Sequence, residues 1–271
     1  ECYTRSLWVV EGWTSYYDRH FLRRSGRLST ERYLEKLGDD IRKMLRIPGR
    51  LHQSLEESSF DAWIKLYRPD ENTVNSTVSY YLKGSLVALL LDLEIRHRTG
   101  GRRSLDDAMR AMAAYMTPGD PQKMMSASQG DWKAETTFWM DPSQPPQKAE
   151  AKVHNEMIMG GRYLTTRYDG NMMGMPFEGL GTMGYDNGKK MYVSTWVDNM
   201  GTGISYMEGK PSADGKSIEL RGKSFDPMVG KEVMMREVMT FVDDNHQKME
   251  MYTSPSEKGK EVKTMEINLS R

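Results

Sequence analysis

Hydrophobic residues in the first third of the chain recur at helical spacing. Over residues 7–24, LWVVEGWTSYYDRHFLRR, the apolar and aromatic positions fall on one face, as in an amphipathic helix. A second helix is predicted from Ser29 or Thr30, both favourable N-caps, to the stop signal at Pro48-Gly49. Residues 54–72 are polar and predict an irregular segment.

A third long helix is predicted over residues 77–98. Its apolar run, residues 86–91, is far shorter than the ~20 residues that span a bilayer, which predicts a core helix and no membrane span. Ser104 with Asp107 three residues later resembles a capping box, and predicts a last short helix ending near Met112. The first part of the chain is therefore predicted to be all-α.

After a short helical stretch at residues 122–127, the pattern changes to alternation of apolar and polar residues, which is typical of strands. Turn-forming pairs such as Gly160-Gly161 and Asp214-Gly215 separate many of the segments. The predicted strands cover residues 132–140, 151–158, 163–169, 177–185, 190–198, 203–209, 217–222, 232–243, 248–253 and 261–269. Short strands at this spacing predict an antiparallel meander closed into a barrel, because closure removes exposed edges. A barrel of this size can enclose one small apolar ligand.

Residue usage changes abruptly near residues 110–120. Residues 1–112 contain 15 Arg, 4 Lys and 3 Met, whereas residues 113–271 contain 5 Arg, 14 Lys and 20 Met. We therefore expect two domains, 1–112 and 113–271, with separate histories. A fusion of two genes, natural or from faulty assembly, explains such a change.

Charge and cysteine content narrow the function classes. The formal net charge is zero, with +3 before residue 113 and −3 after it, and neither value predicts binding to nucleic acid or to an acidic membrane. The single cysteine, Cys2, cannot form an internal disulfide and so indicates no redox compartment.

The helical part resembles a known family in three motifs. Residues 7–17 (LWVVEGWTSYY), 58–73 (SSFDAWIKLYRPDENT) and 79–96 (SYYLKGSLVALLLDLEIR) are similar to the later part of the catalytic domain of glycyl aminopeptidases, metallopeptidase family 61. In this family, as in other gluzincins, two His of an HExxH motif and a later Glu hold zinc. The resemblance implies that Glu11, in Glu-Gly-Trp-Thr, descends from that zinc ligand. It also implies that Tyr81, in Tyr-Leu-Lys-Gly, corresponds to the tyrosine that binds the oxyanion.

The chemistry of a catalytic zinc site requires more than Glu11. Three protein ligands and a general base are needed, and none of the five His of the chain lies in an HExxH motif. In the family, that motif lies just upstream of the point at which this chain starts. We therefore expect a catalytically inactive gluzincin fragment, with zinc bound only if the HExxH segment is supplied. The alternative is a fragment of a longer, active zinc aminopeptidase with a peptide substrate.

The strand-patterned part resembles a bacterial family called domain of unknown function 1579. The motifs are NEMIMGGRYL at residues 155–164, MGMPFEGLGTMGYDNGKKMYVSTWVDNM at residues 173–200 and REVMTFVDD at residues 236–244. The resemblance implies a lipocalin-like β-barrel and carries no assigned activity. The whole chain is thus expected to be an α+β multidomain protein, an all-α gluzincin fragment followed by an antiparallel lipocalin-like barrel.

Residue types suggest what the barrel binds. Twenty Met would supply a flexible, polarizable wall for a small apolar ligand, although Met also fills ordinary cores. Aromatic residues are candidates for the cavity lining, and the few arginines are candidates to pair with a carboxylate head group. The candidate ligand-binding residues are Trp132, Tyr163, Arg167, Trp196, Arg236 and Tyr252. Alternatively, these aromatics are barrel core, these arginines are solvated, and the barrel is a structural module without a pocket.

Overall fold

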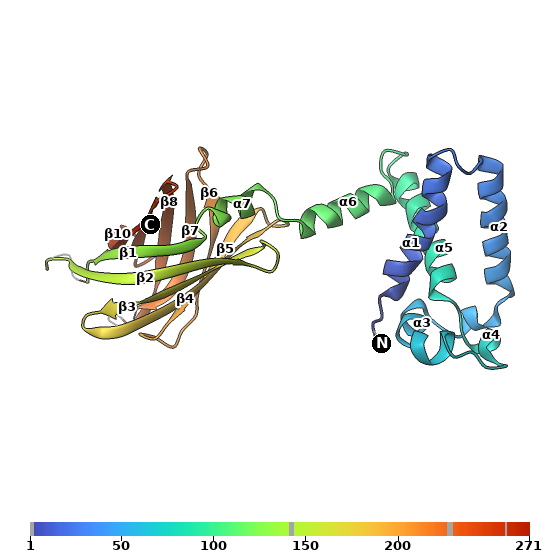
Figure 1. The fold of residues 1–271 in the computed structure, drawn as a ribbon, viewed down its shortest axis with the longest axis horizontal. Helices are drawn as coiled ribbons and strands as arrows, with labels where there is room; N and C mark the ends of the chain where they lie inside the picture. Colours follow the sequence, from blue (N-terminus) through green and yellow to red (C-terminus); the bar gives the residue numbers. More distant parts are fainter. Residues whose placement is uncertain (1–2, 141–143, 227–229, 258) are drawn as a thin grey trace. The chain divides into compact units, whose positions relative to one another are not determined.

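The computed structural model describes residues 3–140, 144–226, 230–257 and 259–271 of the chain. The chain divides into two compact units, Glu1–Met112 and Ala113–Arg271 (Figure 1). The first is helical and the second is a closed antiparallel barrel, so the predicted α+β class is confirmed. Cys2 lies outside the described residues.

The helical unit is built on the long helices α1, α2 and α5. Its elements in chain order are α1 (Leu7–Arg24), α2 (Thr30–Arg46), η1 (Pro48–Leu51), α3 (Leu55–Phe60), η2 (Ala62–Leu66), α4 (Thr73–Ser76), α5 (Tyr80–Arg98) and the first two thirds of α6 (Leu105–Met116), whose last four residues belong to the second unit. The helix predicted over residues 7–24 is confirmed with the same bounds. Helix α5 starts three residues later than predicted, because Ser79 is its N-cap and accepts a hydrogen bond from the Leu82 N–H. No helix among the described residues combines the length and hydropathy needed to cross a lipid bilayer.

The prediction of an irregular segment over residues 54–72 is wrong, since α3 and η2 lie within it. A capping box starts α3: the Glu57 N–H donates to Ser54 Oγ (3.1 Å), and the Ser54 N–H donates to Glu57 Oε2 (2.8 Å). Reciprocal capping stabilises a short helix that has little hydrophobic periodicity of its own.

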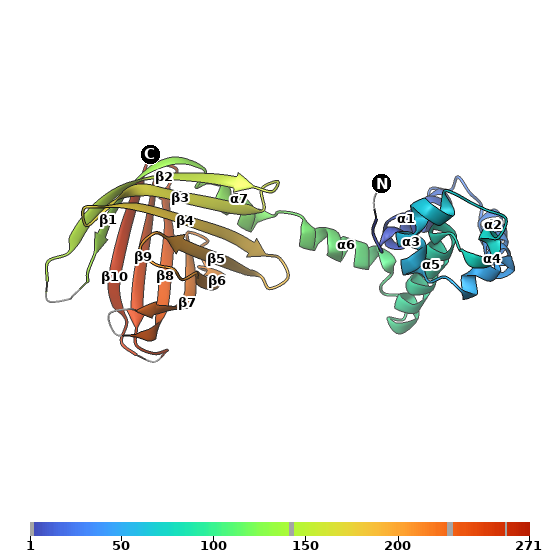
Figure 2. The same cartoon turned by 90° about the horizontal axis from the view of Figure 1, so that it is seen from below.

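Helices α1 and α5 lie side by side (Figures 1 and 2), and glycine sets their distance. A Cβ atom at Gly12 of α1 would lie 2.7 Å from the Cα of Gly84 on α5, and a Cβ at Gly84 would lie 2.7 Å from the Trp8 carbonyl oxygen. Any larger side chain at either position would therefore force the helices apart.

A buried carboxylate ties the helices to one another. Asp92 of α5 accepts hydrogen bonds from Tyr16 of α1 (2.9 Å), from Arg96 (2.8 Å) and from the Leu105 N–H at the start of α6 (2.6 Å). Burial by itself would raise the pKa of Asp92, but these hydrogen bonds outweigh burial and hold the pKa below its ordinary value.

The barrel consists of ten antiparallel strands in chain order, and it closes where β1 pairs with both β2 and β10. The ten strands of the predicted meander are all present (Figure 2). They are β1 (Gly130–Phe138), β2 (Gln147–Ile158), β3 (Tyr163–Met172), β4 (Met175–Asp186), β5 (Met191–Asp198), β6 (Ser205–Pro211), β7 (Ser217–Asp226), β8 (Lys231–Asp243), β9 (His246–Ser254) and β10 (Val262–Ser270).

Helix α7 (Asp120–Ser126) lies against one end of the barrel (Figure 1). Its Met125 is buried among inward-facing residues that include Met183, Tyr192 and Leu220. The Tyr192 hydroxyl donates to the Pro121 carbonyl (3.2 Å), which fixes the helix to β5. Side chains fill this end of the barrel, and three of them, Leu164, Met183 and Met207, also border the open space in the interior.

Candidate functional site

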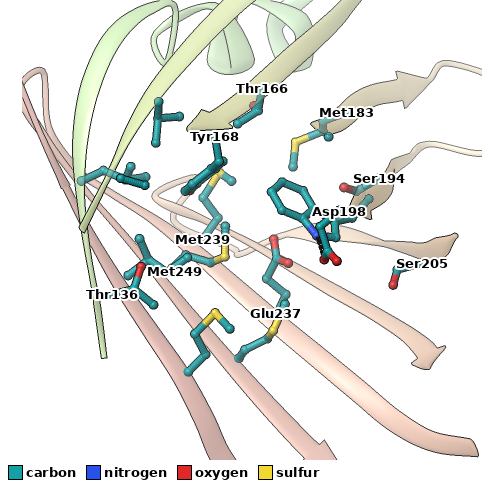
Figure 3. Close-up of a pocket in the computed structure, with 18 of the residues that line it drawn as sticks. Thr136, Thr166, Tyr168, Met183, Ser194, Asp198, Ser205, Glu237, Met239 and Met249 are labelled. Carbon is teal, nitrogen blue, oxygen red and sulfur yellow. Dashed lines mark hydrogen bonds between the residues drawn. The ribbon is translucent and has the colours of Figure 1, made fainter. Parts of the chain in front are cut away.

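The barrel encloses a cavity of about 350 Å³. Methionine is the commonest residue in its lining, and several of these side chains appear in Figure 3. The lining methionines are Met172, Met183, Met200, Met207, Met235, Met239, Met249, Met251 and Met265. Unbranched thioether side chains adapt to irregular apolar shapes, so this wall can adjust to a molecule placed inside it.

Strand alternation decides which side chains reach the cavity. On β8, Met235, Glu237 and Met239 line it, and Arg236 between them faces outward. On β5, Ser194 and Trp196 line it in the same way. On these two strands the inner face thus combines apolar side chains with the polar Ser194 and Glu237.

Glu237 is the most unusual of these polar groups. Its carboxyl group points into the cavity (Figure 3), and the residue is only 6% exposed. Within the described part of the chain it receives no hydrogen bond and forms no ion pair, and burial alone raises its pKa to about 7. A buried carboxyl without a partner is costly to the fold, so this position needs an explanation other than stability.

Two aromatic rings line the cavity with Glu237. Tyr168 of β3 and Trp196 of β5 meet edge to face, with ring centroids 5.4 Å apart. Burial raises the pKa of Tyr168, and the nearby Glu237 carboxylate raises it further. The indole Nε1–H of Trp196 donates to Asp198 Oδ2 (2.8 Å), which orients the ring.

Glycine makes room for the Trp196 ring. A Cβ atom at Gly179 would lie 2.3 Å from Cζ2 of the indole, and one at Gly181 would lie 3.2 Å from its Cε3. The Gly-Leu-Gly sequence of β4 therefore lets the indole lie flat against the neighbouring strand.

Asn155 is a second polar residue of the cavity lining that lacks a hydrogen-bond partner for one of its atoms. The Asn155 Nδ2 donates to the Ser128 carbonyl (2.9 Å), but its Oδ1 is buried and has no donor within the described part of the chain. Asp198 and Glu237 are the charged side chains on the cavity side, whereas the neighbouring Glu150 is exposed on the outer face and pairs with Lys133 (3.3 Å). No Lys, Arg or His is among the described lining residues, so the charge that faces the cavity there is negative.

Of the six ligand-binding candidates from the sequence, Trp196 alone lines the cavity. Trp132 also points inward, but it is buried in the wall, where its Nε1–H donates to the Ser128 carbonyl (2.8 Å). Tyr163 is on the outer face, and its ring covers Gly184 of β4. The exposed Arg167 pairs with Glu178 (3.7 Å) on that same face.

Arg236 and Tyr252 also lie on the outer face, where they pack together. The guanidinium lies 4.0 Å from the centroid of the Tyr252 ring and pairs with Glu261 (2.7 Å). The arginines thus do not supply a head-group site inside the barrel. Sequence reasoning missed Glu237, although Arg236 and Glu237 are adjacent in a strand, so that one of the two charges has to face inward.

In the helical unit, the structure brings Glu11 and Tyr81 close together. The Tyr81 hydroxyl lies 3.2 Å from the Tyr67 hydroxyl, which in turn lies 3.0 Å from that of Tyr80. The hydrogen bond with Tyr67 is the main cause that raises the pKa of Tyr81, and the Glu11 carboxylate adds to the effect. Both residues therefore share one region between α1 and α5.

The residues present do not complete a zinc site there. A catalytic zinc takes three protein ligands, and the described residues bring together no group of three His, Cys, Asp or Glu side chains. Glu11 would be a single ligand, so no catalytic step through zinc can be derived from these residues.

Comparisons with known proteins agree with the division into two parts. Residues 117–271 match the family model described as protein of unknown function (DUF1579), and residues 1–87 match that of M61 glycyl aminopeptidase. Among curated proteins, no sequence matches the chain.

Several solved structures are each similar to part of the chain. An aminopeptidase N family protein from Idiomarina loihiensis is 46% identical over 40% of this chain and 19% of its own, with a TM-score of 0.39. The chain thus spans about a fifth of that protein's length. Rv2717c from M. tuberculosis is 15% identical over 57% of this chain and 99% of its own, with a TM-score of 0.42. The S-type phycobiliprotein lyase CPES from Guillardia theta is 6% identical over 59% and 96%, with a TM-score of 0.40.

Residues 1–87 are thus similar to M61 glycyl aminopeptidases, and through its barrel, which makes up more than half of its length, the chain belongs to the DUF1579 family.

Proposed function

We propose that the barrel binds a small, largely apolar molecule in its interior. The observation that carries this proposal is the cavity of about 350 Å³ with the unpartnered Glu237 carboxyl facing into it. Small-molecule sites are typically apolar clefts of about 300 to 1,000 Å³ with a few polar groups that orient the ligand. The methionine wall, the two aromatic rings and Glu237 fit that description.

A purely structural barrel is the competing explanation. Such a barrel gains stability by filling its interior with well-packed side chains and by pairing every buried polar group. Here the interior holds open space, and both Glu237 and Asn155 Oδ1 lack partners within the described part of the chain. The open space and the unpaired polar groups destabilise the free protein. A bound ligand would fill the space and supply partners for these groups.

Binding can be tested with the neutral fluorescent dye N-phenyl-1-naphthylamine. Ser194 faces the cavity and its neighbour Thr195 faces outward on β5, so Ser194→Phe and Thr195→Phe form a matched pair. We expect the dye to bind the parent protein and Thr195→Phe, and to bind Ser194→Phe at least about tenfold more weakly, since the ring occupies the ligand's space. No dye binding to the parent protein, or equal binding to both variants, would favour the structural barrel.

For the helical unit we propose that Glu11 and Tyr81 correspond to peptidase site residues, but that residues 1–271 alone do not hydrolyse peptides. This proposal is supported by the number of zinc ligands, because Glu11 supplies one carboxylate and a catalytic zinc takes three protein ligands. The test is the zinc content of purified protein after dialysis, measured by mass spectrometry. We expect far less than one zinc per chain and no change on Glu11→Ala. One zinc per chain that is lost on Glu11→Ala would instead support the active peptidase.

A further inference from the structure

The charged groups that face the barrel cavity are carboxylates, and this property points to the chemistry of the ligand. Within the described part of the chain, the carboxylates of Asp198 and Glu237 are on the cavity side, and no Lys, Arg or His lines the cavity. Arg167 and Arg236 face outward, where they pair with Glu178 and Glu261. A ligand with an anionic head group would therefore find no cationic partner among the described lining residues. A ligand with hydrogen-bond donors and positive charge would be complementary.

Glu237 is placed to receive such a group. The residue is 6% exposed, and its carboxyl lacks a partner within the described residues and points into the cavity (Figure 3). A cation that hydrogen-bonds to a buried carboxylate removes the desolvation cost of that carboxylate, and charge-assisted hydrogen bonds are roughly twice as strong as neutral ones. Glu237 therefore favours a ligand that carries an N–H cation.

The aromatic pair adds a second attraction for a cation. Tyr168 is close enough to Glu237 for the carboxylate to affect its hydroxyl, and its ring packs edge to face on Trp196. The faces of tyrosine and tryptophan rings attract cations, most strongly where water is excluded. A carboxylate beside two aromatic rings is an arrangement that recognises ammonium groups.

The rest of the lining is suited to an alkyl chain. Met183, Met239 and Met249 contribute flexible apolar surface around the same space (Figure 3). We infer that the cavity takes an amphiphile whose polar end is a protonated amine, held by Glu237 beside the rings of Tyr168 and Trp196. This inference rests on the proposed function, that the barrel interior binds a small molecule.

The experiment is a calorimetric titration at pH 8 with three ligands that share a ten-carbon chain: decylamine, decanol and decanoate. The parent protein should bind decylamine at least about tenfold more tightly than decanol, as expected for a charge-assisted hydrogen bond. It should bind decanoate most weakly. Equal binding of decylamine and decanol, or tighter binding of decanoate, would overturn the inference while leaving binding by the barrel intact.

The variant Glu237→Gln keeps the side-chain shape and removes the charge. It should lose the preference for decylamine over decanol, whereas Glu232→Gln, an exposed carboxylate on the outer face of the same strand, should keep it. Preference retained in Glu237→Gln would overturn the assignment of this residue. Failure of all three ligands and of the neutral dye to bind the parent protein would overturn the proposed function itself.

The dependence of binding on pH tests the role of Glu237 separately. The other titratable residues that border the cavity are Tyr168 of β3, Asp198 of β5 and Glu150 of β2, whose side chain points outward to Lys133. Decylamine affinity of the parent protein should fall as the pH is lowered from 8 to 6, because Glu237 takes up a proton near pH 7. Glu237→Gln retains the other three groups, so the same fall in that variant would contradict the assignment.

Discussion

Arg236 and Glu237 are neighbours on β8 and face opposite sides of the barrel wall. Outside, the Arg236 guanidinium pairs with Glu261 (2.7 Å) and lies over the Tyr252 ring. Inside, the Glu237 carboxyl faces the cavity without a partner among the described residues. One side chain thus contributes to the stability of the barrel, and the other is available to a ligand.

Glu237 should make the stability of the free barrel depend on pH. Its pKa rises from 4.5 in the unfolded chain to about 7 in the folded barrel, so between these values the folded state binds more protons. The free energy of unfolding should therefore fall as the pH rises from about 4.5 to about 7, by roughly 3 kcal/mol from this group. Urea denaturation of the parent protein and of Glu237→Gln at several pH values measures the difference. A constant difference across this range would contradict the buried, unpaired state of Glu237.

Arg236→Ala should weaken the barrel without affecting its ligand. The side chain loses two partly exposed ion pairs and its contact with Tyr252, for which we expect a cost of about 1 kcal/mol. Arg167→Ala is the control, since this arginine is exposed and forms one long ion pair, and its loss should cost less than about 0.5 kcal/mol. Urea denaturation measures both costs. Loss of dye binding in Arg236→Ala would show that the outer face takes part in recognition after all.

Gly179→Ala should displace the Trp196 ring. The new methyl group would lie 2.3 Å from the indole, and forced rearrangement in a packed interior costs about 1 to 3 kcal/mol. Gly203→Ala is a matched control, because a Cβ atom there meets no neighbour within 4 Å. Thermal unfolding and tryptophan fluorescence report on the change. An unchanged emission spectrum and melting temperature in Gly179→Ala would contradict the packing of Trp196 against β4.

Asp92→Ala should unfold the helical unit more easily and leave the barrel unaffected. The substitution removes the acceptor of three hydrogen bonds and leaves the buried Leu105 N–H unpaired, which predicts a loss of about 3 kcal/mol. Asp39→Ala removes only an exposed pair with Arg42 and should cost less than about 0.5 kcal/mol. Circular dichroism at 222 nm follows the helices. If the substitution instead shifted the unfolding transition of the barrel, followed by its β-sheet signal, the two units would not unfold independently.

The helices and strands were easier to predict from local sequence patterns than the residues of the candidate site were. Helix α1 and the strands of the barrel were predictable, because their periodicities of 3.6 and 2 extend over many residues. Helix α3 was missed because the Ser54–Glu57 capping box, rather than periodicity, defines it.

The alternation of residues along a strand separates its two faces but does not show which face points into the barrel. Tyr163 and Tyr252 were therefore as plausible for the lining as Trp196, and only the closure and register of the barrel separate them. For Glu237, the adjacent Arg236 showed that one charge must face inward, but the partners of Arg236 come from Glu219 on β7 and from Glu261. Such long-range pairs are not visible in the local pattern.

The most direct test of binding inside the barrel is nuclear magnetic resonance of methyl-labelled methionine, with decylamine added to the parent protein. Met183, Met239 and Met249 line the cavity, whereas Met159 and Met173 are exposed outside it. Ligand in the cavity should shift the methyl resonances of the first three and leave those of the other two unchanged. Shifts confined to Met159 and Met173, or no shifts at saturating ligand, would contradict binding inside the barrel.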